Sequence, residues 1–120
     1  MTYKEVYQVI SGISMTTSST GPNIPAAYLQ FPEDDPNNPS PPFICYYYTG
    51  DNDLKADDIN YQPIRQLTIE LYCDNKDFTI EQTVEDALTS HGIVYSKMEA
   101  YIDSEKMYQT VYETEVVING

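Results

Sequence analysis

The residues best suited to chemistry are carboxylates, and the segment from Asp51 to Asp58 supplies four of them within eight residues. Carboxylate oxygens are the ligands that Ca²⁺ and Mg²⁺ prefer. In an EF-hand that starts at Asp51, however, glycine is required where Ala56 stands, and a bidentate glutamate where Gln62 stands. The segment therefore does not match a calcium loop. A metal-dependent hydrolase built on it is kept as an alternative from a different functional class.

The other titratable residues form no catalytic pattern. His91 is the only histidine, and its place in the last turn of an expected helix suits interaction with the helix dipole or with the core. The sequence has no nucleophile elbow, no glycine-rich phosphate loop and no zinc-ligand spacing. Glu81, Glu85 and Asp86 are expected on the outward side of that helix, as a solvated charge face. We therefore predict a protein that is not an enzyme, with no cofactor and no bound metal.

Cys45 and Cys73 both lie in strand-like runs. The N-terminus lacks the basic region and apolar block of a signal peptide, and no apolar run is long enough to span a bilayer. We therefore expect residence in a cytoplasm, where free thiols pack as small core hydrophobes. A disulfide between neighbouring strands is the alternative, and the sequence leaves it open.

The chain of 120 residues carries 19 acidic and 6 basic residues, for a formal charge of −13. Such a surface repels the phosphate backbone and anionic membranes, so neither is expected to bind. The 12 tyrosines combine a large apolar body with a polar tip, which suits surfaces that become buried against partners. The length predicts one domain over residues 1–120.

The clearest structural signal lies in residues 64–92. Residues 64–73 alternate as a half-buried strand does, with an apolar face of Leu67, Ile69, Leu71 and Cys73. The spacing then becomes helical, with an inner face of Ile80, Val84, Ala87, Leu88 and His91. The helix is capped at its start by Asp77 or by Thr79, and Thr79 would form a capping box with Gln82. Gly92 supplies the left-handed backbone conformation that ends the helix.

The rest of the chain supplies one more helix and several strands. The pattern over residues 2–15 predicts a helix capped by Thr2 with Glu5. The pattern over residues 43–48 predicts a central strand covered on both faces. Exposed loops are expected at residues 16–21, 32–42 and 50–58, and further strands at residues 26–31, 59–62, 93–102 and 107–118. This order predicts an α+β fold, a single two-layer domain whose mostly antiparallel sheet carries two α-helices on one face.

The amino-acid sequences of these strands and turns are similar to those of one protein family along nearly the whole chain. The matching stretches are residues 28–33, 41–47, Asp57-Asp58 with Tyr61, 67–72, 86–88, 91–93, 103–108 and 112–116. On these stretches the chain resembles the small tail-terminator, or tail-completion, minor tail proteins of long-tailed bacteriophages and of prophages of Gram-positive bacteria. The stretches include no catalytic signature.

The resemblance implies a ring, usually of six subunits, that closes on the tail tip and caps the head-proximal end of the tail tube. Such a ring stops tube polymerisation and joins the tail to the head. It implies as partners other copies of the chain, the tail tube protein and the head-completion or connector protein. DNA would pass through without specific binding. The expected location is the virion, after assembly in the host bacterial cytoplasm.

Two sets of residues suit such a ring. An acidic lumen keeps DNA from sticking, and the candidates for the lumen or a ring face are Glu33, Asp34, Asp35, Asp51, Asp53, Asp57 and Asp58. Plain surface solubility is the other explanation for each of them. Aromatic and proline residues suit heterologous subunit contacts, and the candidates are Tyr28, Phe31, Pro41, Pro42, Tyr46, Tyr48 and Tyr72.

Three other functions stay open from the sequence. A head-completion or stopper protein also forms rings at the head–tail junction. The acidic hydrolase requires a metal, and calorimetry with divalent cations tests it. An acidic phage-encoded inhibitor that mimics nucleic acid would bind a basic protein in a salt-sensitive way.

Overall fold

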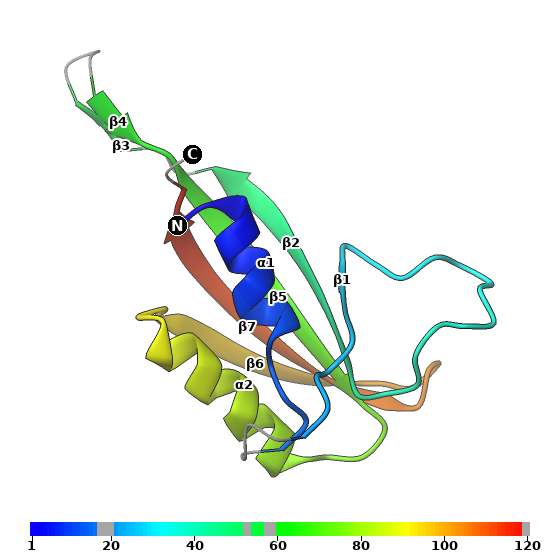
Figure 1. Cartoon of the computed structure of the whole chain (residues 1–120). Coiled ribbons are helices and arrows are strands. Elements are labelled where there is room, and N and C mark those ends of the chain that lie inside the picture. Colours follow the sequence, from blue (N-terminus) through cyan, green and yellow to red (C-terminus); the bar gives the residue numbers. More distant parts are fainter. Residues whose placement is uncertain (17–20, 52–53, 57–59, 119–120) are drawn as a thin grey trace.

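A computed structural model describes residues 1–16, 21–51, 54–56 and 60–118. Within residues 51–62, only the backbone of the described residues is considered. Figure 1 shows a twisted sheet with two helices beside it. The elements are α1 (Tyr3–Ser11), β1 (Ala26–Tyr28), β2 (Phe43–Asp51), β3 (Leu54–Ala56), β4 (Asn60–Gln62), β5 (Ile64–Cys73), α2 (Phe78–Ser90), β6 (Tyr95–Ile102) and β7 (Met107–Val117).

The main sheet has five strands in the order β1-β2-β5-β7-β6. Its centre is β5, which pairs antiparallel with β2 on one side and with β7 along all ten of its residues on the other. The predicted central strand, β2, therefore lies one position away from the centre. Only the β1–β2 pair is parallel among the described main-sheet pairs. Strand β1 ends at Tyr28, before the predicted Phe31, because Leu29 adopts a left-handed φ of 69° and turns the chain away.

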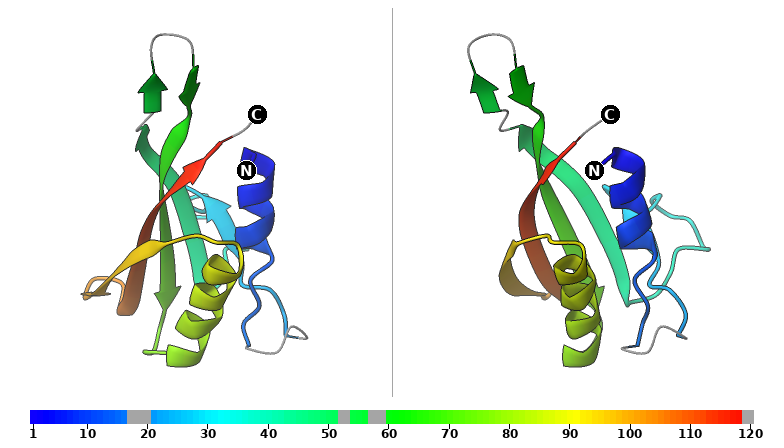
Figure 2. Two further views of the ribbon diagram at one scale, coloured as in Figure 1. Left: turned by 90° about the vertical axis from the view of Figure 1, so that its left-hand side faces the viewer. Right: turned by 60° about the vertical axis from the view of Figure 1, so that its left-hand side comes forward.

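Both helices cover the same face of the sheet, as Figure 2 shows. The predicted inner face of α2 is confirmed for Ile80, Val84 and Leu88, which are buried, and is wrong for His91, which is exposed. The three buried side chains meet the alternating apolar residues of β5 and the fully buried Tyr112 of β7. Helix α1 adds Val6 and Ile10. This two-layer arrangement confirms the predicted α+β fold, in which a mostly antiparallel sheet carries two helices on one face.

The helix ends follow local side-chain chemistry. Thr2 and Glu5 form the predicted capping box at the start of α1. At α2 the cap is Asp77, whose carboxylate accepts a hydrogen bond from the Ile80 N–H at 3.1 Å. The alternative cap, Thr79, is wrong because that residue lies inside the first helical turn. Gly92 has the expected positive φ, 71°, just after the helix.

The predicted acidic loop over residues 50–58 is partly wrong. Strand β2 continues to Asp51, and β3 then pairs antiparallel with β4 in a two-stranded hairpin. This hairpin, called here the arm, extends from the end of the main sheet where β2 stops and β5 starts (Figure 1). The predicted strand over residues 59–62 is therefore confirmed for residues 60–62, which form β4 of the arm. Residues 52–53 and 57–59 lie outside the described residues.

The two cysteines are free and buried, on opposite faces of the sheet. Cys73 follows the core residue Leu71 by two positions, so it faces the helices. Cys45 lies between Ile44 and Tyr46, which both face the core, so its thiol points to the other face. The sheet itself therefore separates the two sulfur atoms, and the interstrand disulfide that the sequence left open does not form.

We expect neither thiol to react with a water-soluble disulfide reagent in the folded protein. Burial raises the pKa of Cys73 to about 11, and burial together with Glu70 raises the pKa of Cys45. Little reactive thiolate is therefore present at neutral pH. Thiol titration in native buffer should find almost no free thiol, and titration in strong denaturant should find two per chain. A fast native reaction would contradict the packing of these strands.

Candidate functional site

A group of aromatic side chains and one cation forms an exposed surface at the β1 edge of the sheet, on the face that carries the helices. It is called here the tyrosine patch and consists of Tyr3, Tyr28, Tyr46, Tyr48 and Arg65. These residues line a hollow of about 470 Å³. Tyr3 and Tyr28 are 45% and 52% exposed, so a large aromatic area meets solvent. Such rings, with apolar bodies and polar tips, are enriched at protein interfaces.

Strand register and one helix bring the patch together. Tyr28 of β1 lies opposite Tyr46 of β2, and their rings meet edge to face at 5.3 Å between centroids. Tyr48 lies two residues further along the same face of β2. From α1, Tyr3 meets the Tyr48 ring at 5.1 Å, and Arg65 donates a hydrogen bond from Nε to the Tyr3 hydroxyl at 3.2 Å. The patch thus joins α1, β1, β2 and β5.

The other face of the sheet carries no helix (Figure 2) and is called here the uncovered face. On it, Phe43 stacks on Tyr72 at 5.0 Å between ring centroids. The carboxylate of Glu70 accepts hydrogen bonds from the Tyr47 and Tyr72 hydroxyls, at 2.9 and 2.8 Å. Gln109 of β7 donates to the Tyr72 hydroxyl at 3.0 Å. These bonds tie β2, β5 and β7 together on a face that remains open to solvent.

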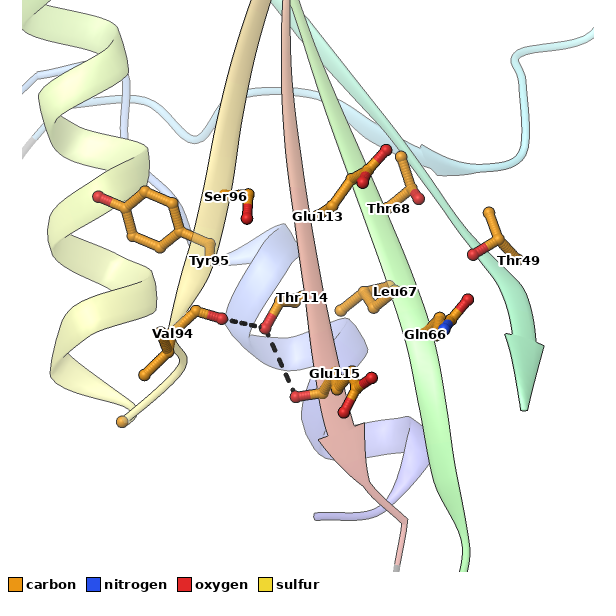
Figure 3. A pocket seen from close by; sticks show the side chains of 11 residues that line it. Thr49, Gln66, Leu67, Thr68, Val94, Tyr95, Ser96, Glu113, Thr114 and Glu115 are labelled. Atoms are coloured by element: carbon orange, nitrogen blue, oxygen red, sulfur yellow. Dashed lines mark hydrogen bonds between the residues drawn. The ribbon is translucent and has the colours of Figure 1, made fainter. Parts of the chain in front are cut away.

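A broad hollow of about 760 Å³ lies toward one end of this face, across β5, β7 and the start of β6 (Figure 3). Most of its lining residues carry a hydroxyl, amide or carboxylate group. The lining residues are Thr49, Gln66, Leu67, Thr68, Gly92, Val94, Tyr95, Ser96, Glu113, Thr114 and Glu115. The lining includes two carboxylates and no lysine or arginine, so the hollow is unfavourable for a phosphate group.

The four acidic candidates for a lumen or ring face that lie among the described residues do not gather in one place. Glu33, Asp34 and Asp35 lie in the loop before β2, where the Asp35 carboxylate accepts a turn hydrogen bond from the Asn37 N–H at 2.9 Å. Asp51 lies at the far end of β2, opposite Arg65 in the register. At the usual rise per residue, about 25 Å separates the two ends of this strand. The remaining candidates, Asp53, Asp57 and Asp58, lie outside the described residues.

The residues expected at subunit contacts separate into two groups. Tyr28, Tyr46 and Tyr48 belong to the tyrosine patch. Phe31 and Tyr72 flank Phe43 instead, and Phe31 meets the Phe43 ring at 5.5 Å. Pro41 and Pro42 are half-buried and directly precede β2, which begins at Phe43. The sequence did not identify Tyr3 and Arg65 as members of a contact surface. The available signal for Tyr3 was its position in the first turn of an amphipathic helix.

The predicted solvated charge face of α2 is wrong for two of its three residues. Glu81 is only 2% exposed and forms ion pairs with Lys76 at 2.7 Å and Lys97 at 3.0 Å. Glu85 binds Lys97 at 2.8 Å and accepts a hydrogen bond from the Tyr112 hydroxyl at 2.9 Å. Although burial opposes it, the hydrogen bonds that Lys97 donates to the Glu85 and Glu81 carboxylates raise the pKa of Lys97. Only Asp86 is exposed, as predicted.

No group of three or more histidine, cysteine, aspartate or glutamate side chains suited to a metal ion is found among the described residues. The ring of His91 is exposed at the end of α2, with Nδ1 2.8 Å from the Ala87 carbonyl oxygen, which fits the predicted interaction with the helix dipole. No helix in the described part of the chain is long and apolar enough to cross a membrane.

We expect the folded protein to lose stability in alkali. Burial and neighbouring phenols raise the pKa of Tyr48 to about 12, and burial raises the pKa values of Tyr72 and Tyr112 as well. A folded pKa above the unfolded value of 10.0 means that folding favours the protonated phenol. Its contribution is complete below about pH 10 and is lost as the pH rises through the folded value. The urea concentration at the unfolding midpoint should therefore fall above about pH 10. In the folded protein, the tyrosinate absorbance should appear at a higher pH than it does in the unfolded chain.

Comparison with known proteins gives a likeness in fold. No protein-family model matches this sequence, and no curated protein matches it. A solved chain from the "Virion of native gene transfer agent (GTA) particle" aligns with a TM-score of 0.50 and 10% sequence identity. The alignment covers 78% of this chain and 78% of that chain. At this identity the match shows that the two chains share a fold.

Proposed function

We propose that this chain is a non-enzymatic structural protein of a phage-like particle, and specifically a tail terminator. The observation that carries the proposal is the shared fold with a chain of a gene transfer agent virion, over 78% of both chains. The resemblance of the strand and turn sequences to tail terminators supports the same role. In that role, copies of the chain form a ring at the head-proximal end of the tail tube and join the tail to the head.

The surface chemistry supports this role in two ways. The tyrosine patch offers exposed aromatic area for contact with another protein. The hollow on the uncovered face has carboxylates and hydroxyls but no basic side chain in its lining. A surface of this kind allows DNA to pass without binding it. Glu33, Asp34, Asp35, Asp51, Asp53, Asp57 and Asp58 remain candidates for the lumen or a face of the ring.

Electron microscopy of a lysate from a phage that lacks this gene tests the proposal. Tails of abnormal, unregulated length beside DNA-filled heads are the expected result. Normal tails beside emptied heads would instead assign the chain to the stopper at the head–tail junction. Intact infectious particles would rule out both roles. Expression of the gene from a plasmid in the same host is the control, and it should restore normal particles.

A further inference from the structure

The uncovered face of the sheet carries negative charge without basic side chains from its strands. Strands β2, β5, β6 and β7 contain only two basic residues, Arg65 and Lys97. Arg65 donates a hydrogen bond to the Tyr3 hydroxyl of α1, and Lys97 forms ion pairs with carboxylates of α2, so both face the helices. The glutamates that point to the uncovered face from β5 and β7 are Glu70, Glu113 and Glu115. This face therefore attracts cations.

Glu113 lies in a cross-strand row between two hydroxyl side chains. Thr68 of β5 lies opposite it on one side, and Ser96 of β6 lies opposite it on the other. All three line the hollow of about 760 Å³ that Figure 3 shows. Neighbouring strands are about 4.8 Å apart, so a group bound above Glu113 is within reach of both hydroxyls. Within the described part of the chain, the Glu113 carboxylate has no hydrogen-bond or ion-pair partner.

Thr68 is a separate indication that the hollow holds a ligand. Its side chain points to the uncovered face, because Leu67 and Ile69 on either side of it both enter the core. Thr68 is only 5% exposed, and its hydroxyl makes no hydrogen bond to any described residue. Buried polar groups in folded proteins nearly always have a hydrogen-bond partner. A donor group bound in the hollow would supply one.

We propose that the hollow binds a primary ammonium group, with Glu113 as its ion partner and the Thr68 and Ser96 hydroxyls as further acceptors. An ammonium has three N–H donors and no acceptor, which matches one carboxylate flanked by two hydroxyls. Both a lysine side chain of a partner protein and a free diamine carry such a group. A divalent metal ion is a poorer match, because the described residues include no group of three metal-binding side chains. The inference goes beyond the proposed function and does not rest on it.

A titration of the isotope-labelled full chain, followed by NMR at constant ionic strength, tests the site. Butylammonium chloride should give saturable shifts at the amide signals of Thr68, Ser96 and Glu113. Tetramethylammonium chloride carries the same charge without an N–H donor, and it should give no saturation. Equal binding of the two cations, or no saturable binding of butylammonium, would overturn the site. Tighter binding of methylguanidinium would overturn the choice of an ammonium.

Substitution of Glu113 tests its role as the ion partner. Glu113→Gln should weaken butylammonium binding at least about tenfold, because a hydrogen bond to a charged acceptor is lost. The matched control is Glu105→Gln in the exposed turn between β6 and β7, which removes the same charge outside the hollow. It should change the binding less than about twofold. Similar losses in the two variants would reduce the effect to overall charge and contradict the site.

Thr68→Val separates a binding role from a structural one. The variant keeps the shape of the side chain and removes the hydroxyl, and it should weaken butylammonium binding about threefold. Its midpoint in urea unfolding should not fall, because the hydroxyl has no partner among the described residues of the free protein. A clear loss of stability would show that the hydroxyl is already paired and would remove Thr68 from the site.

Two further ligands identify the source of the ammonium. Putrescine is a free diamine, whereas Nα-acetyl-lysine methylamide represents a lysine side chain within a protein. Tighter binding of putrescine would assign the site to a free diamine, and tighter binding of the blocked lysine would assign it to a partner protein. Either result supports the site. Because all these titrations use the isolated chain, the ammonium site stands or fails separately from the proposed virion role.

Discussion

Replacement of Tyr112 by alanine is expected to lower the free energy of unfolding by about 4 kcal/mol, as for other fully buried aromatic residues. Tyr112 is completely inaccessible to solvent and is the largest of the fully buried side chains. It lies on β7 and packs against α2, and its ring contacts the ring of Tyr95 edge to face at 5.4 Å between centroids. Removal of the ring leaves a cavity that the helix and the sheet close only in part.

Tyr112→Phe is the matched control for this prediction. It keeps the ring and removes only the hydroxyl, which donates to Glu85 at 2.9 Å. Because Glu85 also binds Lys97 at 2.8 Å, the carboxylate remains paired, and we expect a loss of about 1–2 kcal/mol. Urea unfolding of the three proteins, followed by circular dichroism, measures both differences. Equal losses for the two variants would mean that the hydrogen bond, and not the packing of the ring, holds this part of the core.

The second large effect is expected at Glu81, where Glu81→Gln should lower the free energy of unfolding by about 2 kcal/mol. The carboxylate is 2% exposed and pairs with both Lys76 and Lys97. Loss of one partner from a fully buried ion pair costs about 3–5 kcal/mol. The effect should be smaller here, because the two lysines are 24% and 33% exposed and keep Glu99 and Glu85 as partners.

Glu99→Gln provides the matched control for Glu81. Glu99 also pairs with Lys76, but its side chain is 53% exposed, and exposed ion pairs contribute little to stability. Urea unfolding at low and high salt measures both variants. We expect the Glu81 effect to persist at high salt, since a buried pair is poorly screened. If Glu99→Gln destabilised the protein as much as Glu81→Gln, burial would not be the source of the effect.

Most of the secondary structure was predictable because its signals lie within a few residues of one another. The alternation along β5 indicates which of its side chains enter the core, and Leu67, Ile69 and Leu71 are all buried. The capping box of Thr2 and Glu5 spans one helical turn. Gly92 ends α2 because its left-handed backbone favours glycine over other residues. From these local rules the α+β class and the two-layer arrangement follow.

The candidate site was predictable only in part. The abundance of tyrosine indicated contact surfaces, and Tyr28, Tyr46 and Tyr48 do lie together. The sequence did not indicate that Tyr3 joins them, because α1 reaches the patch only through the packing of the helix on the sheet. Nor did it separate Tyr72 from this group, since the face of each strand in the assembled sheet depends on register.

Long-range pairing decided the rest. Glu81 and Glu85 are separated in the sequence from Lys97, which reaches α2 from β6, and helical periodicity alone carries no information about such a partner. The same holds for the parallel β1–β2 pair, the arm and the exposed edge at β6. The sequence by itself determined the elements and their inner faces, because these depend on near neighbours. The tertiary structure decided which charges are buried and which edges remain open, because these depend on residues distant in the chain.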